Sequence, residues 1–404
     1  MSLRAPSPRP SLPDSLRARF PGDALGGAVL IACALLAMAW ANSPGSAAYF
    51  GLLATRLPLP LGPLAPALDL SVLHWINDLA MALFFLAVGM EIKREFAVGE
   101  LKDPRRAALP IAGALGGMIV PALIYAAFNR YGPGAHGWGI PMATDIAFSL
   151  GVLALLGPRV PRGITVFLAA LAIADDLGAV LVIALFYAGQ LRLLALGAVG
   201  AIVVLLAVLA RRGVTRLWPY LAAAPFLWYA MLASGVHATI AGVLLAWTIP
   251  LGTPFERLQR ALKPWVAWVV MPLFAIANAG VRLEGLSLAA LAQPVPLGVA
   301  LGLLVGKPIG ILGLAWLTVR AGWAKLPRGA AWLHMTGVGM LAGIGFTVAL
   351  FVASLSFHGG DGLEPLAKLG ILTASTAAAV LGAGFLSWAL AHAPAPAGAE
   401  TGEP

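Results

Sequence analysis

The sequence predicts an all-α integral membrane protein with about twelve spanning helices. Of its 404 residues, 60% are hydrophobic and 11% are charged, and the mean hydropathy is +0.90. Soluble domains usually carry about 25% charged residues. The apolar residues also gather in runs of about 20, which is the length that a helix needs to cross the hydrocarbon core of a bilayer. One polytopic membrane domain fits this pattern better than several soluble domains.

The spans lie between the charged residues. The first apolar run is too long for the apolar part of a cleaved signal peptide, so we expect a retained helix there. No charged residue occurs between Arg216 and Glu256, and we divide that stretch at Ser234–Gly235 into a seventh and an eighth span. The twelve expected spans are 24–42, 72–92, 107–128, 134–156, 163–188, 193–210, 217–233, 235–250, 264–281, 295–318, 332–356 and 366–390.

The distribution of basic residues predicts the orientation. With twelve spans, 20 Lys and Arg residues fall on the side of the two termini and 5 on the other side. Cytoplasmic loops are enriched in Lys and Arg, so both termini are expected in the cytoplasm. The net charge of +9 therefore reflects membrane topology and not a nucleic-acid partner. The single cysteine, Cys33, lies in the first apolar run and excludes an intrachain disulfide.

Five charged residues lie inside the spans and away from the span ends, where each costs roughly 2.5–3.5 kcal/mol and marks an ion or proton pathway by default. They are Asp78 in the second span, Asp145 in the fourth, Asp175 and Asp176 in the fifth, and Lys307 in the tenth. A buried ion pair that only fixes helix packing is the alternative reading. Four acids against one base cannot be neutralised by pairing, however, so protons or metal cations are needed. Carboxylate oxygens suit a hard cation such as Na⁺, and competition between Na⁺ and H⁺ for one carboxylate would produce exchange.

Two spans are expected to be broken near their middle. The fourth contains Pro141 and several glycines just before Thr144 and Asp145, and the eleventh contains the glycine-rich stretch Gly337–Thr347. Broken backbone at membrane depth is tolerated only where it is buried in protein or lines a cavity. Each break leaves partly positive and partly negative helix ends, which Asp145 and Lys307 could offset. The breaks fall at comparable places in spans 3–5 and 10–12, which suggests an inverted repeat with the site at its interface.

The chain resembles the NhaA family of sodium/proton antiporters from about residue 20 to residue 390. The matching stretches, in order, are Trp75–Asp78, Val88–Glu95, Ala143–Phe148, Leu171–Gly178, Ser234–Thr239, Gly306–Pro308 and Gly343–Thr347. The resemblance implies an electrogenic antiporter of the bacterial inner membrane that extrudes Na⁺, or Li⁺, in exchange for protons and needs no cofactor. It implies a transporter domain at 23–391, and we expect disordered cytoplasmic tails at 1–22 and 392–404.

The resemblance also assigns roles to residues. Asp176 is implied as the main Na⁺ ligand with Asp175 beside it, and Thr144, Asp145 and Lys307 complete the site, with Lys307 paired to Asp175. A second set is implied in the cation funnel or in the response to pH. Its members are Asp78, Glu91, Arg94, Glu95 and His237. A solvated helix end held by ion pairs is the alternative reading for Glu91, Arg94 and Glu95, and a packed histidine is the alternative for His237.

Two departures from the family pattern stand out. Members often have a β-hairpin in the first outer loop that pairs two subunits, but this chain has four prolines between Leu57 and Pro66. Proline removes an N–H donor from a strand, which argues against a homodimer that forms through that element. Gln259 stands where an acidic residue of the pH-responsive cluster is expected, although Glu256 lies three residues earlier and could present a carboxylate on the same face.

Two other functions fit the sequence less well. A sodium-coupled symporter on the same inverted-repeat fold would need a polar pocket for an organic substrate, and the spans offer few polar residues besides the acids. An intramembrane aspartyl protease places its two Asp residues on separate helices, one of them in a Gly-x-Gly-Asp sequence. That sequence does not occur here, and Asp175 and Asp176 are adjacent.

Overall fold

The computed structural model describes residues 22–60, 68–284, 288–357 and 362–392, so the predicted tails lie almost wholly outside the described residues. Its elements are α2 (Gly22–Ala41), α3 (Ser46–Ala54), β1 (Arg56–Leu59), β2 (Leu68–Ser71), α4 (Val72–Trp75), η1 (Ile76–Ala80), α5 (Met81–Val98), η2 (Glu100–Lys102), α6 (Pro104–Phe128), η3 (Pro133–Met142), α7 (Ile146–Leu155), η4 (Gly157–Arg159), α8 (Arg162–Phe186), α9 (Leu193–Arg211), α10 (Trp218–Ser234), α11 (Ile240–Thr248), α12 (Thr253–Trp265), η5 (Val266–Val270), α13 (Met271–Asn278), η6 (Leu288–Ala292), α14 (Pro294–Leu301), η7 (Gly302–Gly306), α15 (Lys307–Arg320), α16 (Trp332–Leu341), α17 (Phe346–Ser356) and α18 (Leu363–His392).

The structure confirms a polytopic helical membrane protein. Within the described residues, seven helices are long and apolar enough to cross a membrane, or up to ten if each of three bent pairs counts as one span. The expected number of twelve is not confirmed. The difference lies at the seventh and eighth expected spans, because α10 has 17 residues and α11 only 9. The eighth span is short because residues 235–239 are not helical and Gly235 has a φ of 85°.

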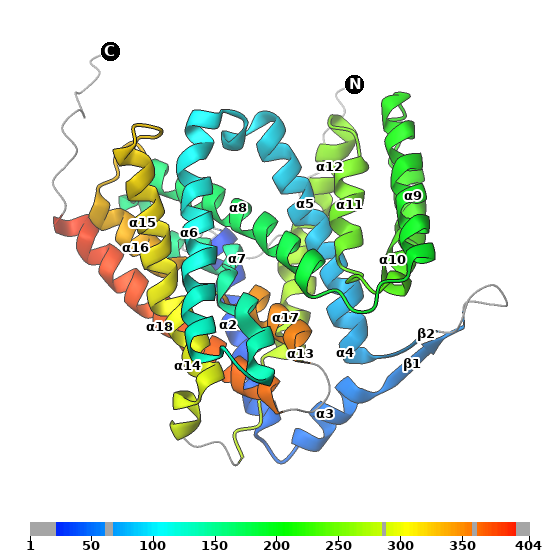
Figure 1. The fold of residues 1–404 in the computed structure, drawn as a ribbon, viewed down its shortest axis with the longest axis horizontal. Helices are drawn as coiled ribbons and strands as arrows, with labels where there is room; N and C mark the ends of the chain where they lie inside the picture. The colour runs from blue at the N-terminus through cyan, green and yellow to red at the C-terminus, as the bar shows by residue number, and fades with distance from the viewer. Residues whose placement is uncertain (1–21, 61–67, 285–287, 358–361, 393–404) are drawn as a thin grey trace, which may run out of the picture.

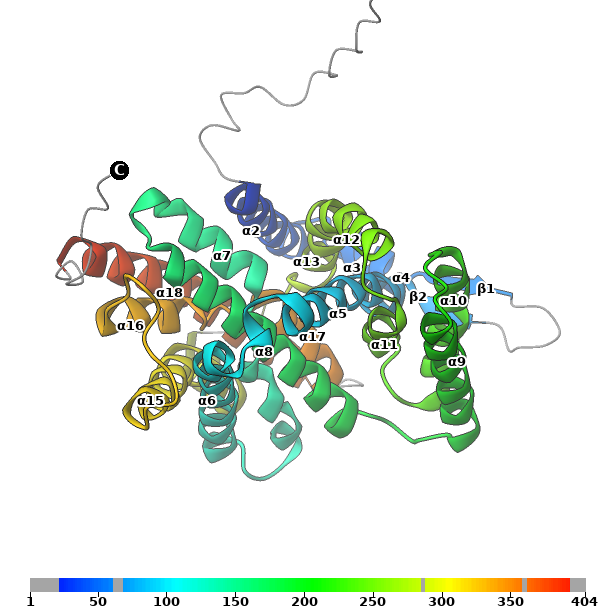
Figure 2. The same ribbon diagram turned by 90° about the horizontal axis from the view of Figure 1, so that it is seen from above.

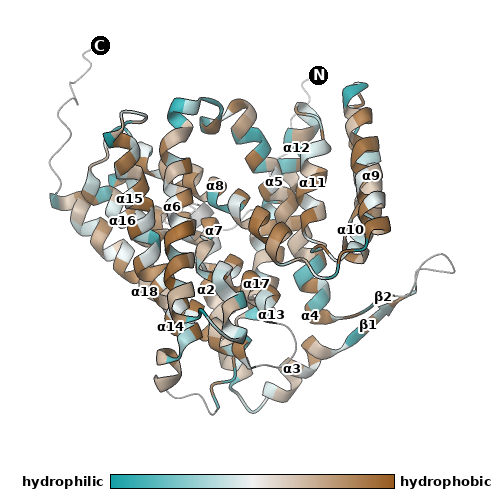
Figure 3. Cartoon of the chain, viewed as in Figure 1, coloured by the Kyte–Doolittle hydropathy of each residue, from teal (hydrophilic) through white to brown (hydrophobic). Residues whose placement is uncertain are grey.

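The helices form an elongated bundle (Figure 1). In both views α9 and α10 lie at one side, α15, α16 and α18 lie at the other, and α8 and α17 lie between them (Figure 2). One group of helices is joined by contacts between neighbours: α6 packs against α8, α14 and α15, and α16 packs against α8, α15 and α18. Helix α18 also packs against α14, and, apart from this group, α5 packs against α11. Much of the outward length of these helices is apolar, and polar residues gather toward their ends (Figure 3). This is the distribution of a protein whose helices cross a bilayer.

Glycines bring two helix pairs into backbone contact. A Cβ atom on Gly116 of α6 would overlap the carbonyl oxygen of Gly310 on α15, and a Cβ on Gly310 would overlap that of Gly116. On the other pair, a Cβ on Gly242 of α11 would overlap the carbonyl oxygen of Ala82 on α5. Small residues allow membrane helices to approach this closely. The contact between α6 and α15 fixes the start of α15, where Lys307 lies.

The first outer loop forms a hairpin in spite of its prolines. Strands β1 and β2 pair antiparallel, with Pro58 opposite Asp69. The amide of Val72 donates to the carbonyl of Thr55 at 2.9 Å, which makes that pair a hydrogen-bonded one. Because such pairs alternate along an antiparallel ladder, the pair of Pro58 and Asp69 is a non-hydrogen-bonded one. The missing N–H of Pro58 therefore costs no ladder hydrogen bond, and the other prolines of the loop that follow residue 60 lie outside the described residues.

Candidate functional site

Two broken helices meet at the centre of the site. The pair η3 and α7 bends by 44° at residues 143–145, and the pair α16 and α17 bends by 47° at residues 342–345, so the predicted breaks are confirmed. The amide of Asp145 donates to the carbonyl of Ile344 at 2.7 Å, and the hydroxyl of Thr144 donates to the carbonyl of Ala342 at 2.8 Å. The two breaks thus satisfy each other's backbone groups, as buried irregular backbone requires. We call this region, residues 143–149 and 341–347, the crossing.

The carboxylate of Asp145 lies at the amino ends of both α7 and α17. Its Oδ1 accepts a hydrogen bond from the amide of Phe148 at 3.0 Å, which is the N-cap contact of α7. Its Oδ2 accepts from the amide and from the hydroxyl of Thr347, at 3.2 and 2.5 Å. The side chain is 1% exposed. A negative charge at two helix amino ends offsets both positive ends, so Asp145 has the position that the sequence predicted.

Lys307 reaches the crossing from α15. Its ammonium group donates to Oδ2 of Asp175 at 2.6 Å and to the hydroxyl of Thr144 at 2.8 Å, and both members of the ion pair are 0% exposed. The pairing of Lys307 with Asp175 is the one that the resemblance implied. The hydroxyl of Thr144 that accepts from Lys307 donates onward to the carbonyl of Ala342, at the carboxyl end of α16. The π-helical turn η7 directly precedes it, with Pro308 in the following turn; such turns often occur at functional sites.

Asp175 and Asp176 lie side by side in α8 and are 1% and 3% exposed. One oxygen of each carboxyl group, Oδ1 of Asp175 and Oδ2 of Asp176, is buried and has no hydrogen-bond partner among the described residues. A buried carboxyl oxygen without a donor is costly. Of the three acids near the crossing, Asp145 is held by helix-end donors and Asp175 by Lys307. Asp176 is therefore the acid that is least satisfied by the protein itself.

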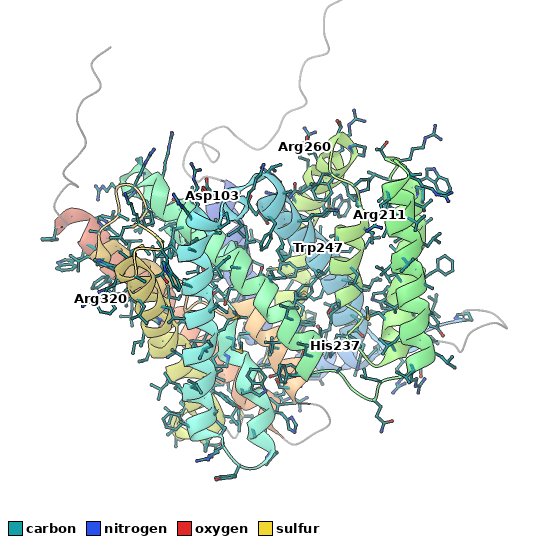
Figure 4. All side chains as sticks on the ribbon, turned by 45° about the horizontal axis from the view of Figure 1, so that its top comes forward. Asp103, Arg211, His237, Trp247, Arg260 and Arg320 are labelled. Carbon is teal, nitrogen blue, oxygen red and sulfur yellow. The ribbon has the colours of Figure 1, made fainter. Side chains whose placement is uncertain are left out.

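Asp78 and His237 lie away from the crossing. Both line a half-open pocket of about 770 Å³, together with His136, Tyr187 and Ser356 among others. Figure 4 shows His237 toward the end of the bundle opposite Asp103, Arg211 and Arg260. The ring of His237 packs edge-on against Phe351 of α17, with the ring centroids 6.2 Å apart. The structure thus brings Asp78 and His237 into one pocket at the predicted outer end of the helices.

Glu91, Arg94 and Glu95 lie near the other end of α5. Glu91 faces Lys263 of α12 at 3.9 Å, Oε2 of Glu95 accepts from the amide of Glu100 at 3.1 Å, and Arg94 is exposed. Their neighbour Lys93 has a structural role that the sequence did not indicate. Its ammonium group donates to the carbonyls of Trp247 and Ile249, at 2.7 and 2.5 Å, at the carboxyl end of α11. A cation at that end offsets the helix dipole.

Gln259 and Glu256 do not share one environment. Gln259 in α12 is 4% exposed, and its Nε2 has no hydrogen-bond partner among the described residues. Glu256 is exposed. The suggestion that Glu256 could present its carboxylate beside Gln259 is therefore wrong for this structure. The cause is the face of the helix that packs: Phe255 and Gln259, four residues apart, are both buried.

Two residues of the site were missed as site residues. Thr347 donates twice to Asp145, and the hydroxyl of Ser375 on α18 accepts from the amide of Phe346 at 3.0 Å, which helps to cap α17. The threonine ends a motif of the resemblance, so its position was visible. The serine gave no local signal, because its partner lies 29 residues away in the chain.

The comparisons with known proteins agree with this geometry. The family model described as Na⁺/H⁺ antiporter 1 matches residues 18–386. The chain is 51% identical to the Na⁺/H⁺ antiporter NhaA 2 of Pseudomonas syringae pv. syringae, with 94% of this chain and 97% of that protein covered. It is 50% identical to the Na⁺/H⁺ antiporter NhaA of Rhodospirillum rubrum (89% and 94% covered) and 49% identical to that of Shewanella loihica (90% and 95% covered). The chain therefore belongs to the Na⁺/H⁺ antiporter 1 family.

Proposed function

We propose that this protein is a secondary active transporter that exchanges Na⁺ for H⁺, with Asp176 as the main ion ligand and Asp175 beside it. The observation that carries the proposal is that Oδ1 of Asp175 and Oδ2 of Asp176, beside the crossing, are buried and accept no hydrogen bond from the described residues. Such an oxygen is satisfied either by its own proton or by a bound cation. Carboxylate and hydroxyl oxygens are hard donors that suit a small hard cation, so Na⁺ and Li⁺ are the expected substrates.

The exchange follows from competition for one group. When Asp176 is protonated, it has no negative charge to attract Na⁺, and when Na⁺ is bound, the proton has left. Asp175 adds a second acid whose charge is balanced by Lys307 at 2.6 Å. If Asp175 takes up a proton in the proton-loaded state and returns to its ion pair with Lys307 when Na⁺ binds at Asp176, two carboxyl groups release their protons for one monovalent cation. More protons than sodium ions then move in each cycle, and the transport is electrogenic.

The burial of the site supports alternating access. The carboxyl groups of Asp175 and Asp176 are almost completely shielded, so ions need a path that opens to one side at a time. The pocket lined by Asp78 and His237 lies at the predicted outer end. We propose that it belongs to the outer path, and that Glu91, Arg94 and Glu95 lie at the inner mouth as part of the cation funnel.

The location and assembly are proposed from topology. Asp103, Arg211 and Arg260 lie at the same end of the helices (Figure 4), and the excess of basic residues predicted there favours a cytoplasmic orientation of that end. The protein would then be a multi-pass protein of the bacterial inner membrane with both termini inside. The hairpin of β1 and β2 projects from the bundle, and all residues of β1 are exposed (Figure 1). Its edges carry backbone groups that can pair with a second chain, which supports a homodimer.

The test is sodium-driven proton flux in proteoliposomes that contain the full-length protein and only inorganic salts and buffer. The wild-type protein should make the lumen more alkaline when the Na⁺ concentration is higher outside, and more acidic when it is higher inside. Asp176→Asn should reduce the flux to the level of empty liposomes, because an amide neither releases a proton nor carries the charge. Glu284→Gln is the control, since Glu284 is an exposed carboxylate outside both the ion site and the hairpin. Undiminished flux in Asp176→Asn would refute the site, and flux that requires an organic solute would indicate a symporter.

A further inference from the structure

A second site lies outside the crossing. A half-open pocket of about 1230 Å³ is lined by the amino-terminal parts of α6 (residues 104–110) and α8 (residues 162–170) and by residues of the connection 322–328 between α15 and α16. None of its lining residues belongs to the crossing. Its charged residues are Arg105, Arg106, Arg162, Lys325, Arg328 and Glu100.

The pocket has a large excess of positive charge. Its one acidic residue, Glu100, lies 3.8 Å from Arg106, and Asp103 lies 3.8 Å from the same guanidinium. Arg106 is thus balanced by local acids. The other four basic side chains of the pocket form no ion pair among the described residues, and all four are exposed; they are Arg105, Arg162, Lys325 and Arg328.

The amino end of α8 adds to this charge. The helix begins at Arg162 after Pro161, with no side-chain cap and no acidic residue in its first turn. The amide of Ile164 donates to the carbonyl of Pro161 at 2.9 Å, and no side chain of the described residues caps this end. Helix amino ends attract anions. Gly163 lets the connection between α15 and α16 approach this end, because a Cβ there would lie 2.5 Å from the carbonyl oxygen of Arg328. The close approach holds Arg328 beside the first turn of α8.

The floor of the pocket is apolar. Leu109, Phe167 and Ala170 are buried beneath the basic rim, and Val166 continues the apolar surface outward. Trp323 lies at the rim and is 73% exposed. Tryptophan is enriched at the level of lipid headgroups. The pocket therefore combines a basic rim at headgroup level with an apolar base, as basic pockets between helices do on the cytoplasmic side.

We propose that this pocket binds a phosphate group, presented by an anionic phospholipid or by a soluble phosphate. Guanidinium groups match phosphate oxygens with paired hydrogen bonds, and Arg105, Arg162 and Arg328 line the same pocket as the first turn of α8. A ligand with a single carboxylate would pair with only one or two of these basic side chains. A neutral solute would leave all of their positive charges without an anionic partner. The proposal concerns ligand binding and does not depend on the ion exchanged at Asp176.

The experiment measures binding to the lipid-depleted, full-length protein in detergent by native mass spectrometry. The probes are phosphatidylglycerol, diacylglycerol, which lacks the phosphate, and inorganic phosphate. The pocket variant is Arg105→Gln/Arg328→Gln. The matched control is Arg257→Gln/Arg260→Gln, which removes two exposed arginines of α12 outside the pocket. Elution profiles before the measurement show that each variant is folded.

Phosphatidylglycerol should bind the wild type, and diacylglycerol should not. Each removed charge should weaken binding about fivefold, and so roughly 25-fold for the pocket variant, whereas the control should change it by about threefold or less. Binding of inorganic phosphate with the same dependence, and no tighter binding of the lipid, would support the phosphate site and identify a soluble ligand. Equal losses in the two variants would show attraction by surface charge alone and overturn the proposal, as would unchanged binding in the pocket variant.

Discussion

Lys307→Ala removes the ammonium group that lies 2.6 Å from Oδ2 of Asp175 and leaves a carboxylate in a site with 0% exposure. At that distance and an effective dielectric constant of 20, the attraction is roughly 6 kcal/mol. Desolvation of both groups offsets part of it, and breaking a buried pair typically costs about 3–5 kcal/mol, because one charge is left uncompensated. We therefore expect Lys307→Ala to lower the free energy of unfolding by about 3–5 kcal/mol.

The reasoning has a direct check in the double variant Lys307→Ala/Asp175→Asn. If the cost arises from the unpaired carboxylate, neutralising Asp175 should restore much of the stability, although transport stays absent. Lys307→Arg keeps the charge and should retain more stability and more transport than Lys307→Ala, although its larger group strains the packed site. The assay is unfolding of the purified protein in mixed micelles, with proton flux measured in parallel. A double variant no more stable than Lys307→Ala would refute the reasoning, and an inactive but folded Lys307→Arg would favour a lysine that releases its proton.

Three further results are expected. Thr347→Val should cost about 1.5–3 kcal/mol of stability, since it removes the hydroxyl bond to the buried Asp145, and Thr347→Ser should keep most of it in the same unfolding assay. Because Gln259 cannot titrate and Glu256 is exposed, acid inhibition should follow competition at Asp176: raising the Na⁺ concentration should shift the activity profile to lower pH without limit, and Gln259→Glu should shift it modestly at most. An acid cut-off that stays fixed at every Na⁺ concentration would contradict this. Asp175→Asn should be almost as damaging to sodium-driven flux as Asp176→Asn, and flux near wild type would remove Asp175 from the site.

The sequence predicted the broad architecture because a bilayer requires long apolar helices and confines most charges to the segments between them. Apolar runs of spanning length, and charges confined to the gaps, located the long helices such as α6 and α8 within a few residues of their observed bounds. Pro141 and the glycines of residues 337–345 located the two breaks, because they weaken a helix whatever surrounds it. The ion pair of Lys307 with Asp175 followed from the resemblance, since charge alone left several acids as its partner.

Other features depend on contacts between distant segments. Helix α3 was not expected, because residues 46–54 carry no span of their own. Pro58 is compatible with a strand only because of its register opposite Asp69, which the composition of the loop does not reveal. Two contacts depend on which helix ends meet in space: Ser375 caps α17, and Lys93 donates to the carbonyls at the end of α11. The fold sets such pairings globally, and a local pattern gives no sign of them.

The shared carboxylate of Asp145 has a mechanical consequence. It joins the starts of α7 and α17 through three hydrogen bonds, and the two backbones are joined again between Asp145 and Ile344. If one broken helix slid past the other, these hydrogen bonds would break. Neither lipid nor the surrounding protein could then supply new partners for the exposed groups. We therefore expect the two helices to travel together as one rigid body, so that opening to either side comes from slippage against the surrounding helices. A cross-link between α7 and α17 should then leave transport intact, whereas one that ties α17 to its outer neighbour α13 should arrest it.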